Sequence, residues 1–292
     1  MHAAAFSADG EQLVSGGEDG TVRLWEAHSG RVLAVWENRL LDHHRAYPVY
    51  AVAFSPSGRA VISGGNDYAV KVRDTRTGEI LKVLGKHYCV LTLGCSTDGT
   101  HLASGSRDCM NADASIKLWD VRSGAEIRTL EGYGGINAVA LSPDGTLVAA
   151  GSNDAAARLW SAKRWSLRRG VLKVLHCAAA VQSVAFSPDG RLLATADNAW
   201  QVRIWDVKSG SERLMNGRHD DSISSVCFSR DGRWLASAGW DSTVRLWDVS
   251  SGSQSNLFRA QAPLLTAVFN PDSRQVWAAD GASVPRTYRF SL

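Results

Sequence analysis

The sequence is poor in features that would tie it to metals, disulfides or membranes. Its 5 cysteines are odd in number and form no Cys-x-x-Cys pair, so neither a disulfide framework nor a zinc site is predicted. The N-terminal stretch lacks the basic and apolar segments of a signal peptide, and no run reaches the roughly 18 apolar residues of a membrane span. We therefore expect buried, reduced thiols in an intracellular, cytoplasmic protein without a membrane partner.

An excess of either charge is also lacking. The chain has 32 Lys and Arg against 29 Asp and Glu, and this balance is not that of a dedicated nucleic-acid-binding protein. Hydrophobic residues make up 45% and charged residues 21%, so a sizeable core is expected and disorder is not. Any basic contact surface must therefore be local.

A helical period of apolar residues is absent as well, and a repeated β-unit is present instead. Each unit has an apolar run, a turn such as Ser-Pro-Asp-Gly, a strand such as Leu-Ala-Ser-Gly, and a strand that ends in Trp-Asp. Successive units begin 41 to 48 residues apart, close to the period of a four-stranded propeller blade. Seven units align on one residue of their first strand: Phe6, Phe54, Cys95, Leu141, Phe186, Phe228 and Phe269.

These units resemble the tryptophan-aspartate (WD) repeat family over essentially the whole chain. The motif occurs at Trp119-Asp120, Trp205-Asp206 and Trp247-Asp248, with variants at Trp25-Glu26, Arg73-Asp74 and Trp160-Ser161. The resemblance implies an all-β fold, a single-domain seven-bladed β-propeller of four-stranded antiparallel blades. The blades are expected at residues 1–46, 47–87, 88–132, 133–177, 178–219, 220–260 and 261–292.

The last blade is expected to be three-stranded or completed by another segment. Met1 to Phe6 already matches an innermost strand, and the final residues match a third strand. The edge between blades one and seven would then lack its usual interlock. A truncated or loose seam and a strand donated by a partner or a neighbouring copy are both open interpretations.

The resemblance also implies a buried hydrogen-bond chain of His, Ser or Thr, Asp and Trp within a blade. Buried indole and carboxylate groups need such partners. The sixth unit has all four residues, His219, Ser237, Asp241 and Trp247. The third has His87, Ser104, Asp108 and Trp119, and the first keeps Ser15, Asp19 and Trp25. Less regular blades are expected where Arg73 replaces Trp, where Ala199 replaces Asp, and in the seventh unit, which has no clear match.

Catalytic and cofactor motifs are lacking too. The seven innermost strands contain no Asp, Glu or His, so they offer neither an acid–base pair nor a metal ring. No nucleophile elbow, phosphate-binding Gly loop or zinc-ligand spacing is present. His43 and His44 have no accompanying ligand cluster and are interpreted as loop residues. We expect no catalysis, no metal and no cofactor.

In the family, the residue before the turn Asp commonly points into the rim of one face of the ring. The matching residues are Glu18, Asn66, Arg107, Asn153, Asn198 and Trp240, with Ala279 a weaker match and Trp200 in a neighbouring loop. The Asn38–Tyr47 connection would rise on the same face. Exposed Trp near Arg is typical of binding hot spots, although Trp240 could also serve as local packing. The leading hypothesis is a scaffold or adaptor that presents these loops to a peptide or protein-complex partner.

A basic hairpin at residues 161–174 suggests an alternative function. Its cations could hold phosphates while its Trp stacks a base, as in a ribonucleoprotein subunit. A solvated hairpin is the other interpretation. The residues concerned are Lys163, Arg164, Trp165, Arg168, Arg169 and Lys173.

Overall fold

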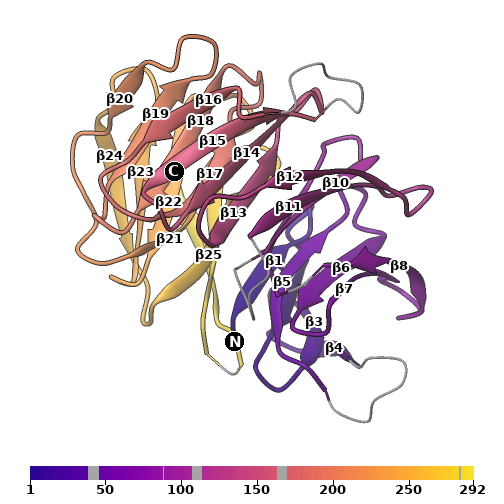
Figure 1. Cartoon of the computed structure of the whole chain (residues 1–292). Coiled ribbons are helices and arrows are strands. Elements are labelled where there is room, and N and C mark those ends of the chain that lie inside the picture. The colour runs from indigo at the N-terminus through magenta and orange to yellow at the C-terminus, as the bar shows by residue number, and fades with distance from the viewer. Residues whose placement is uncertain (39–45, 88, 107–113, 163–169, 283) are drawn as a thin grey trace.

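A ring of β-sheets makes up the structure, a computed structural model that describes residues 1–38, 46–87, 89–106, 114–162, 170–282 and 284–292. The strands of these residues form seven antiparallel sheets arranged as blades around a centre (Figure 1). No described element is a helix, and so none is a long apolar helix of the kind that crosses a membrane. The predicted seven-bladed β-propeller is confirmed.

Each blade is built from consecutive strands, the first innermost and the last outermost. Blade one contains β1 (Ala3–Phe6), β2 (Gln12–Gly16), β3 (Thr21–Glu26) and β4 (Val32–Glu37). Blade two contains β5 (Val49–Phe54), β6 (Ala60–Gly65), β7 (Ala69–Asp74) and β8 (Ile80–Lys86). Blade three contains β9 (Val90–Cys95), β10 (His101–Ser106), β11 (Ser115–Asp120) and β12 (Glu126–Glu131). Blade four contains β13 (Ile136–Leu141), β14 (Leu147–Ser152), β15 (Ala156–Ser161) and β16 (Lys173–His176).

The last three blades follow the same order. Blade five contains β17 (Val181–Phe186), β18 (Leu192–Asp197), β19 (Val202–Asp206) and β20 (Glu212–Leu214). Blade six contains β21 (Ile223–Phe228), β22 (Trp234–Gly239), β23 (Thr243–Asp248) and β24 (Gln254–Arg259). Blade seven contains only β25 (Leu264–Phe269), β26 (Gln275–Asp280) and β27 (Thr287–Ser291) among the described residues, as expected for the last blade.

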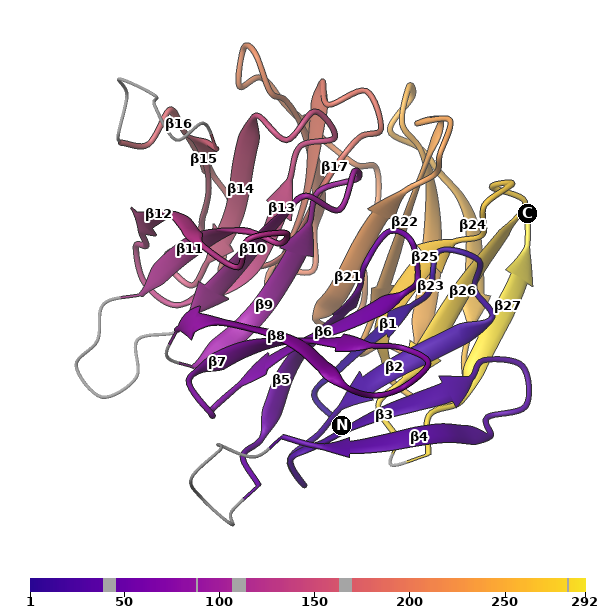
Figure 2. The same ribbon diagram turned by 90° about the vertical axis from the view of Figure 1, so that its right-hand side faces the viewer.

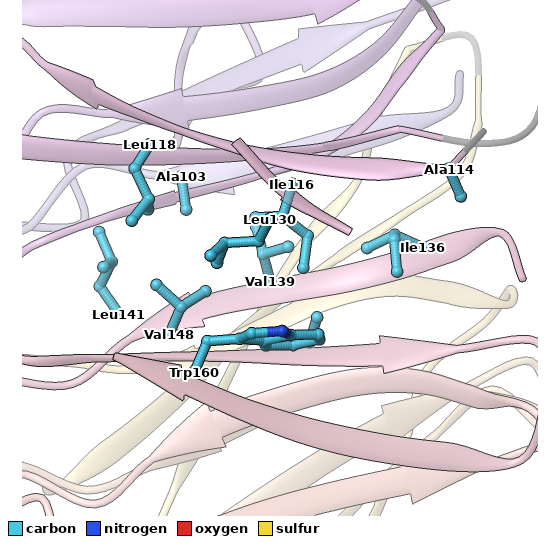
Figure 3. Packing of buried hydrophobic residues seen from close by; sticks show 11 residues of the cluster. Ala103, Ala114, Ile116, Leu118, Leu130, Ile136, Val139, Leu141, Val148 and Trp160 are labelled. Atoms are coloured by element: carbon cyan, nitrogen blue, oxygen red, sulfur yellow. The ribbon is translucent and has the colours of Figure 1, made fainter. Parts of the chain in front are cut away.

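The core lies between neighbouring blades, because a single sheet cannot cover its own apolar faces. Between blades three and four, Ile116 and Leu130 meet Val139, Val148 and Trp160, and side chains of both blades point toward one another (Figure 3). All five are at most 6% exposed. Similar apolar clusters lie between other neighbouring blades and continue the core around the ring. Packing between blades therefore holds the ring together.

A hydrogen bond from the buried Trp of the third strand to a hydroxyl of the second strand recurs in four blades. Each indole Nε1 lies 2.8–2.9 Å from its acceptor, so the buried N–H is satisfied without disturbing the apolar packing. The pairs are Trp25–Ser15, Trp119–Ser104, Trp205–Thr195 and Trp247–Ser237.

The predicted hydrogen-bond chain is complete in blade six. His219 Nε2 lies 2.6 Å from Ser237 Oγ, and His219 Nδ1 lies 2.9 Å from Asp241 Oδ2. Ser237 also accepts the Trp247 indole N–H. The histidine bond lowers the pKa of the Asp241 carboxyl against the opposing effect of burial. These four side chains join the loop before the blade to its second and third strands.

Two blades expected to lack the turn carboxylate supply it from a different position. In blade five, the fully buried Asp197 accepts the backbone N–H groups of Ala199 and Gln201 and contacts Arg203. In blade seven, Asp280 is also fully buried and accepts the Arg286 N–H. The sequence predicts a less regular blade five because Ala199 stands in place of the Asp, and the structure shows a carboxylate at its turn nonetheless. Asp197 reaches the turn from two residues earlier in the chain, and motif alignment at fixed spacing does not detect that shift.

Blade two keeps four strands although Arg73 takes the place of the Trp. The side chain is only 8% exposed, and its guanidinium donates to the carbonyl oxygens of Glu37 and Gly78 at 3.1 and 3.2 Å. Desolvation lowers the pKa of Arg73. Because Glu37 belongs to β4, the guanidinium joins blade two to the outer strand of blade one.

The seam between the last and first blades is sealed by Trp277 of β26, and the two blades lie side by side in Figure 2. The indole packs with Phe6, Leu13 and Trp25 of blade one, and the Phe6 and Trp277 ring centres are 6.3 Å apart. Gly10 lies directly against the indole, where an added Cβ would overlap the ring. Trp277 therefore closes the ring with three strands in blade seven.

Gly10→Ala tests this closure, with Gly30→Ala as its matched control. Both glycines have φ near +70°, but a Cβ at Gly30 would meet nothing within 4 Å. We expect Gly30→Ala to lower the free energy of unfolding by about 1 kcal/mol through backbone strain alone. Gly10→Ala should cost a further ~1–3 kcal/mol because it displaces Trp277. Equal urea-unfolding losses in the two variants would contradict the proposed role of the seam.

Acid should destabilise the protein through His87. Burial and the nearby Lys117 charge lower the pKa of His87 to about 4. An unfolded His titrates near about 6.5, so the unfolded chain gains its proton at higher pH than the folded protein. The free energy of unfolding should therefore fall between about pH 6.5 and 4, by up to about 3 kcal/mol. Urea unfolding of His87→Gln should show a shallower fall over this window, and parallel profiles would refute the assignment.

Candidate binding surface at the channel mouth

A ring of seven inner-strand residues surrounds one mouth of the central channel. In six blades the residue is skipped in the pairing of the first two strands, so that it forms a β-bulge. Such bulges re-aim side chains. The bulged residues are Tyr50, Leu91, Asn137, Gln182, Ser224 and Leu265, and His2 holds the matching place before β1.

This inner ring was not predicted from the sequence. A signal was nevertheless present, since each bulged residue directly follows a buried aliphatic residue such as Val181 or Ile223, and its own type varies from unit to unit. The first strands themselves contain no histidine, but His2, which lies directly before β1, places one at the channel mouth. Its ring lies 5.1 Å from Tyr50 and its Nε2 lies 2.6 Å from Glu18 Oε2.

The turns between second and third strands form an outer ring around the same mouth, and their carboxylates are already engaged. Ion pairs to cations on the third strand join Asp19 to Arg23 at 2.6 Å, Asp67 to Lys71 at 2.6 Å and Asp154 to Arg158 at 2.5 Å. Asp197 contacts Arg203, and Asp241 lies 3.4 Å from Arg245. The residues next to these carboxylates are therefore the ones left to meet a ligand.

Four of the predicted outer-ring residues are exposed on this face, namely Glu18, Asn153, Asn198 and Trp240, and Asn66 is half-buried. Inner and outer rings touch within a blade, since Asn137 donates to Asn153 Oδ1 at 2.7 Å. Arg107 lies outside the described residues. Ala279 is fully buried in the seam, and Gly281 stands at the position that matches Trp240.

A hollow of about 370 Å³ opens where blades five, six, seven and one meet at this mouth. Trp240, 56% exposed, forms one wall, and its backbone N–H donates to the Ser222 carbonyl at 2.8 Å. The other walls combine neutral polar groups with apolar ones. The lining residues are His2, Gln182, Asn198, Ser222, Ile223, Ser224, Trp240 and Leu265.

Trp200 does not line this hollow. It is half-buried in the next turn, and the Arg218 guanidinium lies 5.8 Å from its ring centre, a cation–π contact. Of the predicted residues, Asn198 and Trp240 line the same hollow. Trp200 does not, and its ring contacts Arg218 instead.

Two predicted loops fall largely outside the described residues. Of the basic hairpin, only Lys173 is described among the named residues, and its Nζ donates to the Lys208 carbonyl at 2.7 Å. Lys163, Arg164, Trp165, Arg168 and Arg169 are not described, and neither are His43 and His44. Asn38, at the start of the other loop, is buried and accepts from Lys71 Nζ at 2.9 Å, so it does not belong to an exposed lip.

The described cysteines differ from one another. Cys95, Cys177 and Cys227 carry free thiols, and burial raises the pKa of Cys95 and Cys227 to about 12 and of Cys177 to about 11. These thiols are protonated at neutral pH and are weak nucleophiles. Cys89 is disulfide-bonded, so the expectation of reduced thiols is wrong for this residue. Spacing along the chain does not show which cysteines the fold brings together.

The described residues offer no metal centre, since no group of three or more His, Cys, Asp or Glu side chains is placed to hold an ion. The channel mouth instead combines an exposed Trp, amide side chains and hydroxyls. Such an arrangement suits the recognition of a polar and apolar ligand surface.

A known repeat family matches the chain in six segments that coincide with structural repeats. The family model for the WD40 repeat (WD domain, G-beta repeat) matches residues 2–26, 36–74, 78–120, 124–161, 170–206 and 213–248. No curated protein sequence matches the chain. Blade seven lies beyond the six matches, and in it Phe290 and Ala278 stand where blade six has Trp247 and Ser237. The chain belongs to the WD40 repeat family and folds as a seven-bladed propeller.

Proposed function

We propose that this propeller is a non-catalytic scaffold that binds an extended peptide segment of a protein partner across the channel mouth. WD40 propellers generally serve as scaffolds for protein interactions. The observation that carries the proposal is the 56% exposure of Trp240 at the edge of a hollow of about 370 Å³. A large indole left in water next to a concave surface is typical of an interface anchor.

The chemistry of the hollow fits a peptide. Trp240 and Leu265 offer apolar area to one side chain, while the amides of Gln182 and Asn198 can donate to and accept from a peptide backbone. The His2 imidazole is already close to Glu18. Because the lining lacks an unpaired cation or carboxylate, the residue bound there is best neutral and largely apolar.

The chemistry of the inner strands supports a non-catalytic function. They carry no Asp, Glu or His that could transfer a proton or hold a metal ion. The turn carboxylates around the mouth are held by cations of their own blades. Binding is therefore the proposed activity.

The nucleic-acid alternative remains a prediction about residues 163–169. RNA binding through that hairpin would weaken steeply with added salt and would be lost in Arg168→Glu/Arg169→Glu. Peptide binding at the channel mouth would depend little on salt and would survive that double substitution. Filter binding of single-stranded RNA over a salt series therefore separates the two functions.

Trp240→Ala tests the proposed function. Peptides selected from a random displayed library against the native protein should bind Trp240→Ala about tenfold or more weakly, because the anchor and its apolar area are lost. Thermal stability should change by less than about 0.5 kcal/mol, since the side chain is mostly exposed. Fluorescence anisotropy of labelled peptides measures the affinity.

Asn66→Ala is the matched control, because Asn66 occupies the same turn position in blade two, away from the hollow. It should leave peptide affinity unchanged, and Trp240→Phe should keep most of it. Selected peptides that bind native protein and Trp240→Ala equally would show that the proposed site is wrong.

A further inference from the structure

The outer edge of blade seven is an unpaired strand. Strand β27 pairs with β26 on one side and with no described strand on the other, whereas each of the other six blades has a fourth strand there. The N–H of Asp280 bonds to the Arg286 carbonyl, and the N–H of Leu292 bonds to the Arg274 carbonyl. By strand alternation, even-numbered residues of β27 face β26, and the backbone groups of Thr287, Arg289 and Ser291 point outward.

Closure of the ring does not require a fourth strand in this blade. In blades two to six, a large apolar residue in or just after the outer strand packs on the next blade's third strand, as Leu84 does with Trp119 and Met215 with Trp247. In blade one, the corresponding Trp25 is only 2% exposed because Trp277 covers it from β26. Among the strands that the structure describes, none pairs with the outward edge of β27, although the ring is already closed.

Side chains on β27 set a pattern for a strand that pairs with it. Tyr288 and Phe290 lie on the face toward blade six, stacked on one another, and Phe258 stacks on Phe290 with ring centres 4.9 Å apart. Both rings are half-buried. Arg289 points to the opposite face, is exposed, and lies over Trp277. A strand paired with β27 would therefore lie next to an apolar side chain at Tyr288, a cationic one at Arg289 and an apolar one at Phe290.

The charged side chains of residues 284–292 are both cationic, and the Arg289 guanidinium also donates to His28 Nδ1 of blade one at 3.0 Å. Arg286, just before β27, is exposed, and its side chain donates to the neutral Gln261 amide oxygen at 2.7 Å. Opposite charges on directly opposed strand positions are stabilising, and like charges are destabilising. Two copies paired through β27 would bring their Arg289 side chains and flanking arginines together. The charge therefore favours an acidic strand over a second copy.

We propose that the free edge of β27 binds an extended segment of another protein with apolar, acidic and apolar residues in alternation, as a fourth strand of blade seven. The segment donates to and accepts from the outward backbone groups of Thr287, Arg289 and Ser291. Its acidic residue lies opposite Arg289, and its apolar residues cover Tyr288 and Phe290. This surface lies apart from the channel mouth and does not depend on the proposed peptide site.

The test uses a capped synthetic peptide with a Val-Glu-Val-Glu-Val core and a control peptide with Lys in place of Glu. In hydrogen exchange, the acidic peptide should slow the amides of Thr287, Arg289 and Ser291 and leave those of Tyr288 and Phe290, which already face β26, unchanged. The Lys peptide should have no effect. Arg289→Glu should reverse the preference between the two peptides.

Ser291→Pro removes one outward N–H without breaking a bond to β26, and Ser291→Ala is its matched control. Titration calorimetry should show about tenfold or greater weakening in Ser291→Pro and unchanged affinity in Ser291→Ala and Trp240→Ala. Exchange rates that stay the same at saturating peptide, or equal binding by Ser291→Pro, overturn the proposal. So does a dimer in sedimentation that Ser291→Pro dissociates, since a second copy would then occupy the edge.

Discussion

The structure depends on one constraint, which is that each blade must bury its apolar faces against its two neighbours. An isolated four-stranded sheet leaves both faces in water, and only a closed ring covers all of them. The clusters between blades, such as the one around Trp160 and Leu130, meet this need with close-packed aliphatic and aromatic side chains. Closure is hardest at the last seam, where the fourth strand is absent from the described residues and Trp277 supplies the missing bulk.

Polar groups in the blades are arranged so that this packing is not disturbed. In four blades the Trp indole N–H of the third strand donates to a Ser or Thr hydroxyl of the same blade. The turn carboxylates Asp19 and Asp154 pair with arginines four residues later, on the third strand. In blade seven the side chains at the Trp and hydroxyl positions, Phe290 and Ala278, carry no polar group, and the Trp277 indole N–H donates to Gln275 Oε1 at 3.1 Å instead. With these groups satisfied internally, the exposed residues of the turns are free to vary in type and to meet partners.

The site is a consequence of the same geometry. Bulges in the inner strands of six blades turn one residue of each toward the channel mouth, next to the turn between the second and third strands. Gln182 and Ser224 thereby come to lie beside Asn198 and Trp240, although they are distant in the sequence. A rigid ring thus presents a set of side chains whose types differ around the circle.

Much of the fold and part of the site could be predicted from the sequence. The repeat spacing, the turn residues and the Trp-Asp pairs determine seven units, their antiparallel strands and the hydrogen-bond chain of blade six, because these depend on neighbours within one unit. Exposed positions such as Trp240 and Asn198 follow from the same local alignment. Arg107 and most of the basic hairpin stay predictions.

Contacts between units were decided only by the tertiary structure. Trp277 is an ordinary apolar residue in the sequence, and its role appears only when β26 lies against Gly10 of the first blade. Asp197 and Asp280 stand two residues before the expected turn Asp, and their carboxylates still accept hydrogen bonds from backbone N–H groups of the turn. The inner ring arises from bulges that fixed repeat spacing conceals. The sequence by itself determined what each blade is, and the closed ring decided which side chains meet, because ring closure joins residues that no local pattern connects.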